Sequence, residues 1–89
     1  MQSRRRLVVE WFSGLMLDKL HQPRNLAKGD EWHKDSLGLL LSRLKEELGE
    51  LEAELSRDHI DRSAVVSETV DVANFAMMLA DAVTGSLPG

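Results

Sequence analysis

Two pairs of acidic residues in the second half of the chain have the types and spacing to bind a metal ion. Glu47 and Glu50 form one pair, and Glu68 and Asp71 form the other. Side chains three residues apart on a helix are neighbours on its surface. Carboxylate oxygens are the ligands that hard divalent cations such as Mg²⁺ and Mn²⁺ prefer. If both segments are helices that face each other, all four acids are predicted metal ligands.

The two pairs differ in their apolar surroundings. With about 100° of rotation per residue, Glu47 and Glu50 lie beside a stripe of leucines, a position that ordinary solvated acids also occupy. Glu68 instead lies at the middle of an apolar face, and Asp71 lies on its flank. An ionised carboxylate in such a place is costly to bury unless a cation accompanies it. The second pair therefore carries most of the metal hypothesis.

Few other partners are available for four carboxylates. Arg43 lies one turn before Glu47 on the same side, but one arginine cannot neutralise the whole set. A di-iron carboxylate site is the other metal interpretation, and its helical ligand sets include Glu-x-x-His pairs. No Glu-x-x-His occurs in the sequence, and the related spacing of Asp30 and His33 lies in a predicted loop. The predicted cofactor is therefore Mg²⁺ or Mn²⁺.

Helices must position these acids, and the composition favours helices throughout. Leucine, alanine, glutamate, arginine and methionine, all good helix formers, make up nearly half of the chain, and only two prolines occur. The predicted fold is all-α, a small helical bundle with three main helices per chain, completed by oligomerisation. The predicted helices run from Arg4 to His21 with Ser3 as N-cap, from Ser36 to Arg57 with Asp35 as N-cap, and from the N-cap Asp61 to about Thr84, with Gly85 as the stop.

The segment between the first two predicted helices, residues 22–35, is interpreted as a loop. It contains the turn formers Pro23, Asn25, Gly29 and Asp30. At about 14 residues it is long for so small a domain, and loops of this length are often functional. Its tryptophan suggests that the segment folds back over another part of the chain.

The length of 89 residues indicates one domain, taken as residues 1–89. So short a chain buries a modest share of its surface, and no cysteine is available to staple it. We therefore expect a homo-oligomer, a dimer or a tetramer. The apolar face of the third predicted helix would suit a contact with a second helix; it carries Val66, Val70, Ala73 and Met77.

Charge and hydropathy bear on partners and location. The formal net charge of −4 argues against nonspecific binding of nucleic acid. The segment from Ser3 to Val9 resembles a twin-arginine export motif, but Glu10 interrupts the apolar stretch and no small-residue cleavage site follows. No run approaches the roughly 20 apolar residues of a membrane span. A cytoplasmic protein without a membrane partner is expected.

The acidic pairs also carry a family resemblance. Glu47-Leu-Gly-Glu50, followed after 17 residues by Glu68-Thr-Val-Asp71, resembles the E-x-x-E…E-x-x-D signature of the MazG-type all-α NTP pyrophosphohydrolases. The run Asp71-Val-Ala-Asn74-Phe-Ala-Met-Met-Leu-Ala-Asp81 looks like a helix of small, phage-type, single-domain members. The segment 25–32 looks like the one that precedes their first motif helix.

The resemblance implies a reaction and a partner. Members of the family cleave nucleoside triphosphates between the α and β phosphates, which gives a monophosphate and pyrophosphate. The four acids would hold Mg²⁺, and Glu50 is the residue chosen here as the base that takes a proton from the attacking water. The compact form points to a purine deoxynucleotide, dGTP or dATP. The family usually builds a four-helix unit, so the site is a candidate for sharing between subunits.

Four further residues are candidates for nucleotide contacts. Asn74 lies one turn after Asp71, and its amide either reaches the ligand or makes a polar contact between helices. Trp32 either stacks on a base or caps the core, and Lys28 either meets a phosphate or is solvated. The candidates for nucleotide binding are Asn25, Lys28, Trp32 and Asn74.

Two other functions fit the same sequence. One is a non-catalytic helical oligomerisation module with an acidic surface for a metal or a partner. The other is a sensor that binds a nucleotide without hydrolysing it. The enzyme differs from both by releasing pyrophosphate.

Overall fold

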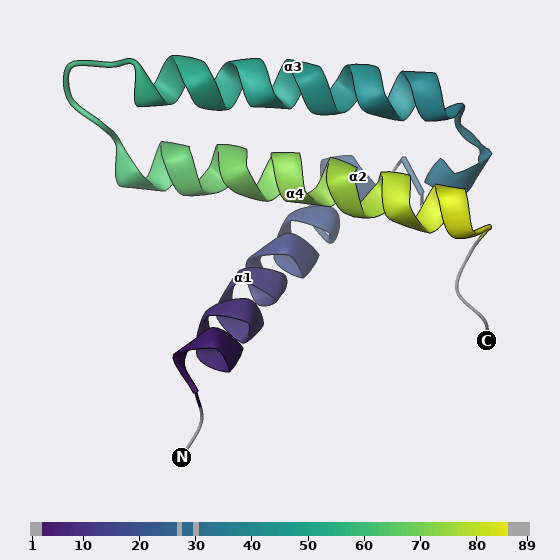
Figure 1. Cartoon of the computed structure of the whole chain (residues 1–89), viewed down its shortest axis with the longest axis horizontal. Coiled ribbons are helices and arrows are strands. Elements are labelled where there is room, and N and C mark those ends of the chain that lie inside the picture. Colours follow the sequence, from purple (N-terminus) through teal and green to yellow (C-terminus); the bar gives the residue numbers. More distant parts are fainter. Residues whose placement is uncertain (1–2, 27, 30, 86–89) are drawn as a thin grey trace.

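The computed structural model describes residues 3–26, 28–29 and 31–85, and all regular secondary structure in these ranges is helical (Figure 1). The all-α class with three main helices is therefore confirmed. The elements are α1 (Arg4–Leu20), α2 (Pro23–Leu26), the short 3-10 helix η1 (Trp32–Lys34), α3 (Leu37–Leu55) and α4 (Arg62–Thr84).

The two longest helices, α3 and α4, run antiparallel and pack side by side over most of their length (Figure 1). Local sequence sets their ends. Asp61 accepts a hydrogen bond from the Ala64 amide at the start of α4, and Gly85 ends it in the left-handed conformation at a φ of 81°. At the start of α3 the cap is Ser36, whose hydroxyl accepts from the Leu39 amide. The prediction of Asp35 as N-cap was therefore wrong by one residue, because Asp35 ends η1 instead.

The segment predicted as a loop contains two short helices. Pro23 is the first residue of α2, where its fixed φ suits a helix and its missing amide hydrogen costs nothing. The second is η1, which begins at Trp32 and contacts α4. Ala27 and Asp30, within the predicted loop, lie outside the described residues. The segment thus folds back along α4, as the tryptophan suggested.

The first helix, α1, leaves the α3–α4 hairpin at a steep angle and meets α4 near the end of α1 (Figure 1). Its predicted N-cap is confirmed, because the Ser3 hydroxyl accepts a hydrogen bond from the Arg6 amide. It ends at Leu20, close to the predicted His21. Much of α1 projects into solvent, with Leu7 and Trp11 both about half exposed.

The core is thin. Within the described residues, the side chains that are fully buried belong to Leu40, Val70 and Asn74. The predicted leucine stripe on α3 is split, because Leu44 and Leu51 are half-buried toward α4 while other leucines of the stripe stay exposed. The exposed members of the stripe are Leu37, Leu41, Leu48 and Leu55.

The apolar face of α4 that was expected to meet a partner is partly covered within the chain. Val70 is 3% exposed, and a groove formed by α1 and α4 runs past it and past Val66. The same helix, Arg62–Thr84, is long and apolar enough to cross a membrane by length and composition alone, and 11% of its most apolar stretch is buried within the chain. Here α4 is the central helix, packed against both α3 and α1.

Candidate metal centre and adjoining cavity

The α3–α4 hairpin brings three of the four predicted metal ligands together. Glu47 and Glu50 project from α3, Glu68 projects from α4, and one carboxylate oxygen of each lies within 4.8 Å of the other two. Glu50 is exposed, whereas Glu47 and Glu68 are half-buried. The one-turn spacing of the first pair and the antiparallel packing of the helices together produce this convergence. Three carboxylates at such distances form a concentrated negative site.

Burial and mutual repulsion keep this cluster from ionising easily. Burial, the neighbouring Glu50 side chain and the charges of Asp71, Glu50 and Glu68 raise the pKa of Glu47 to about 7. Burial and the proximity of Glu50 and Asp71 also raise the pKa of Glu68. One buried oxygen on each of these two side chains, Oε2, has no hydrogen-bond partner among the described residues. A divalent cation would supply both the missing contact and the missing charge.

Asp71, the fourth predicted ligand, has a different partner. Its Oδ1 lies 3.3 Å from the Nζ of Lys19, which comes from α1. The same ammonium donates a hydrogen bond to the hydroxyl of Ser67. Asp71 is still near the cluster, since its charge contributes to the raised pKa of Glu47. The structure therefore divides the four acids into a group of three and one that is paired with a lysine.

Sequence reasoning missed Lys19 as a partner of the acids. It lies about 50 residues from Asp71 in the chain, so no local spacing joins the two. The basic residue that sequence reasoning considered, Arg43, pairs with Glu46 at 3.3 Å, and both are exposed. That leaves Glu47 without the arginine partner considered for it.

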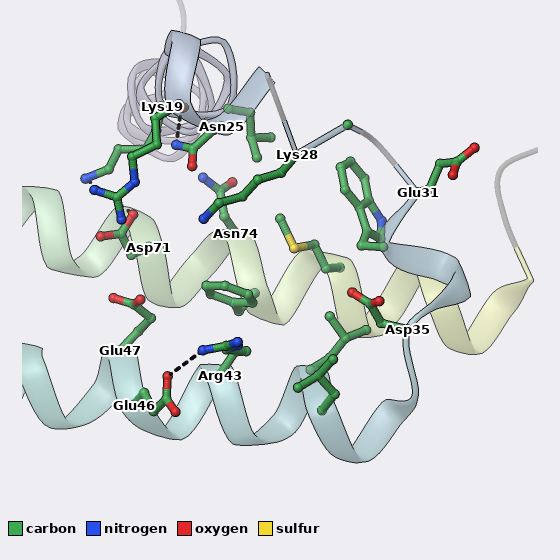
Figure 2. A pocket seen from close by; sticks show the side chains of 18 of the residues that line it. Lys19, Asn25, Lys28, Glu31, Asp35, Arg43, Glu46, Glu47, Asp71 and Asn74 are labelled. Carbon is green, nitrogen blue, oxygen red and sulfur yellow. Dashed lines mark hydrogen bonds and ion pairs between the residues drawn. The ribbon is translucent and has the colours of Figure 1, made fainter.

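A cavity of about 630 Å³ opens beside the carboxylates, between α3, α4 and the segment from α2 to η1 (Figure 2). Glu47 and Asp71 lie at one end of it and face each other from opposite helices (Figure 2). The rest of the wall carries an indole, basic side chains and three further acids, Glu31, Asp35 and Glu46. Glu31 pairs with Lys34, and Glu46 pairs with Arg43. The basic residues are Lys19, Arg24, Lys28, Lys34 and Arg43.

All four predicted nucleotide contacts line this cavity. The side-chain amide of Asn25 donates to the backbone oxygen of Lys19 at 2.8 Å, so Asn25 also fastens the end of α1. Lys28 extends from its loop toward the middle of the cavity (Figure 2). The indole N–H of Trp32 donates to Oδ2 of Asp81 at 2.9 Å, which holds the ring at the α4 wall.

Asn74 makes a polar contact between helices through its amide nitrogen, and its amide oxygen has no partner among the described residues. Its amide nitrogen donates to the backbone oxygen of Met16 at 3.3 Å, the contact between helices. Its Oδ1 is buried and has no partner among the described residues. The side chain is 4% exposed and borders the cavity, so this oxygen lies behind the cavity wall with its acceptor capacity unused.

The arrangement combines two chemistries that phosphate anhydrides require. A carboxylate cluster can hold divalent cations, and basic side chains in the wall, such as that of Lys28, can receive the negative charge of a polyphosphate. The indole and the buried amide oxygen add the apolar surface and the hydrogen-bond acceptor that a nucleoside could use. The comparison with protein-family models, with curated proteins and with solved structures finds no match for this chain.

Proposed function

We propose that the protein is a metal-dependent (deoxy)nucleoside triphosphate pyrophosphohydrolase of the MazG-like type, which converts a dNTP to a dNMP and pyrophosphate. The observation that supports the proposal is the meeting of three carboxylates, Glu47, Glu50 and Glu68, beside a cavity that is large enough for a nucleotide and carries both basic and acidic side chains. A purine deoxynucleotide, dGTP or dATP, is the first substrate to test, on the strength of the sequence resemblance.

The residues present fit Mg²⁺ or Mn²⁺. The donor set consists of carboxylate oxygens, and two of them, Oε2 of Glu47 and of Glu68, are buried without a partner. Glu47, Glu50 and Glu68 would hold the ion, with Asp71 within reach of the same site. A bound cation of this kind lowers the pKa of water and offsets the charge that develops on the phosphates.

The chain's own groups have separate tasks in this reaction. Glu50, the exposed member of the cluster, accepts a proton from the water that attacks the α-phosphorus, and the bond to the bridging oxygen breaks to release pyrophosphate. Lys28 meets the phosphate charge from the cavity wall. Trp32 stacks on the base, Asn74 accepts a hydrogen bond from the sugar, and Asn25 holds the end of α1 in place.

Self-association is part of the proposal, because large apolar side chains are left uncovered on α3. Leu41, Leu48 and Leu55 recur at heptad spacing and are between 42% and 51% exposed. We expect them to pack against a second copy, giving a dimer or tetramer. Light scattering coupled to gel filtration tests this, and replacing Leu48 by Glu should yield monomers. A wild-type monomer at 100 μM or so would contradict the expectation.

The activity is tested by incubating the protein with each of the eight common NTPs and dNTPs and Mg²⁺ or Mn²⁺. We expect pyrophosphate and nucleoside monophosphate in equal amounts. In water enriched in ¹⁸O the label should enter the monophosphate, because attack is at the α-phosphorus. Label in the pyrophosphate would place the attack at the β-phosphorus and contradict the proposed chemistry.

Matched variants keep this test specific to the cluster. Glu68→Gln should lose turnover, whereas Glu52→Gln, an exposed glutamate on α3 outside the cluster, should keep it. Circular dichroism checks that both remain helical. Metal-dependent thermal stabilisation by a dNTP with no product would instead indicate the nucleotide sensor, and neither product nor stabilisation would indicate the oligomerisation module.

A further inference from the structure

The end of α1 holds a lysine ammonium against the acidic site. Lys19 lies in the last turn of α1, and its Nζ pairs with Asp71 and donates to Ser67, both on α4. Both charged side chains of the pair are about one quarter exposed, so the contact is partly shielded from water. Figure 2 shows Lys19 on the α1 side of the cavity, across from Asp71. The ammonium thus lies where a second cation would otherwise reach this carboxylate.

Hydrogen bonds on two sides fix the backbone that carries this lysine. The Asn74 amide holds the backbone oxygen of Met16, one turn earlier, against α4. The Asn25 amide holds the backbone oxygen of Lys19 itself from α2. With its backbone fastened in this way, the lysine loses less conformational freedom on pairing than a lysine on a free surface helix. The ion pair is therefore a built feature of the α1–α4 junction.

The charge of Lys19 acts on the cluster as well as on its partner. Of the groups around Glu68, Lys19 is the one whose charge lowers the pKa of that carboxyl, against the larger effects that raise it. The ammonium is therefore close enough to offset part of the negative charge. An ammonium 3.3 Å from Oδ1 of Asp71 also repels a divalent ion that approaches this carboxylate.

We propose that Lys19 is the resident cation of Asp71, so that without nucleotide the site binds one divalent ion, at Glu47, Glu50 and Glu68, and excludes a second. Asp71 becomes a metal ligand only when Lys19 leaves it, which the phosphates of a substrate would favour by offering the ammonium another anion. Lys19 is a positioning residue in this account, because it acts through Asp71. The inference rests on the proposed metal site.

The test counts Mn²⁺ ions bound per chain without nucleotide, from the loss of the electron paramagnetic resonance signal of free aqueous Mn²⁺. The wild type should bind one ion. Lys19→Met should bind a second, about tenfold more tightly than any second ion in the wild type. Lys45→Met, which removes an exposed lysine on α3, is the matched control and should behave as the wild type. Adding Asp71→Asn to Lys19→Met should return the count to one.

The Mn²⁺ counts of Lys19→Met and of the wild type separate a failure of the Lys19 role from a failure of the metal site. If Lys19→Met binds Mn²⁺ with the wild-type number and affinity, Lys19 is not the resident cation and the inference fails while the metal site stands. If the wild type binds no ion at all, the proposed metal site fails and the inference with it. Lys19→Gln, which keeps a polar contact for Ser67, replaces Lys19→Met if circular dichroism finds the methionine variant unfolded, and the same results are expected of it.

Discussion

The α3–α4 hairpin and the α1 helix with its following segment contribute differently to the candidate site. The hairpin carries all four acids on two antiparallel helices joined by a short connection. The segment from α1 to η1 supplies most of the basic side chains of the cavity wall and the tryptophan, and its polar contacts with the hairpin are made by Lys19, Trp32 and the backbone oxygen of Met16. The acids are therefore positioned by regular helix packing, and the wall by individual long-range contacts.

Under the proposed function, this difference would separate two tasks within one small chain. Metal binding and proton transfer would depend on the hairpin, whose geometry follows from helix periodicity. Recognition of the ligand would depend mainly on the α1 side, which supplies Lys28 and Trp32, with Asn74 added from α4. Substitutions on the hairpin should therefore act on the rate, and substitutions on the α1 side on affinity and on the number of ions.

The largest effect is expected on the hairpin, from Glu50→Gln. If Glu50 accepts the proton, kcat should fall by about a thousandfold, because general base catalysis contributes on the order of that factor. Steady-state assays at saturating dNTP measure it. Raising Mn²⁺ tenfold distinguishes the roles of Glu50, since a residue that acts only as a ligand would be rescued by more metal. Recovery of the rate at high Mn²⁺ would therefore contradict the assignment of Glu50 as the base.

The next largest effect is expected on the free energy of unfolding, which reports how firmly each of the two regions is packed. Leu40 of α3 is 2% exposed, so Leu40→Ala should lower the free energy of unfolding by about 3 kcal/mol. Leu17 of α1 is 53% exposed, and Leu17→Ala should cost less than about 1 kcal/mol. Urea denaturation followed by circular dichroism gives both values. Equal losses would mean that α1 is packed as firmly as the hairpin, for example by a second copy.

A smaller effect is expected from pH in the metal-free protein. The pKa of Glu47 is about 7 in the folded chain and has the ordinary value of 4.5 when unfolded, so the folded state binds more protons between these values. Stability from this group is full below about pH 4.5 and is lost as the pH rises through 7. The melting temperature of the wild type should therefore fall from pH 5.5 to 8 relative to that of Glu47→Gln, which cannot ionise there.

Metal should remove this pH dependence. A cation bound at the cluster favours the ionised form of Glu47, so saturating Mg²⁺ should raise the wild-type melting temperature most at pH 8. Differential scanning fluorimetry at constant ionic strength measures both trends. A wild type that gains stability relative to Glu47→Gln as the pH rises, without metal, would show that Glu47 is not held in a desolvated acidic cluster.

The sequence predicted the hairpin well because its signals are local. The cap at Asp61, the left-handed stop at Gly85 and the one-turn spacing of Glu47 and Glu50 all act within a few residues. It did not predict the ion pair of Lys19 with Asp71, because that contact depends on the angle at which α1 meets α4. The alternative partner, Arg43, had the right local spacing and yet pairs with Glu46.

The smallest effect concerns the tether between the two regions, the hydrogen bond from Trp32 to Asp81. Asp81→Ala removes the acceptor and should cost about 1 kcal/mol of stability, the usual net value of one such bond. Because the indole forms part of the cavity wall, KM for the dNTP should rise by about threefold while kcat stays the same. In a Trp11→Phe background the emission of Trp32 should shift to the red as its ring becomes solvated.

The control for lost charge is Asp58→Ala, which removes an exposed acid in the connection between α3 and α4. If Asp81→Ala shifts the emission of Trp32 to the red and lowers kcat while KM stays unchanged, then the α1 side controls the rate as well, and the division between the two regions does not hold.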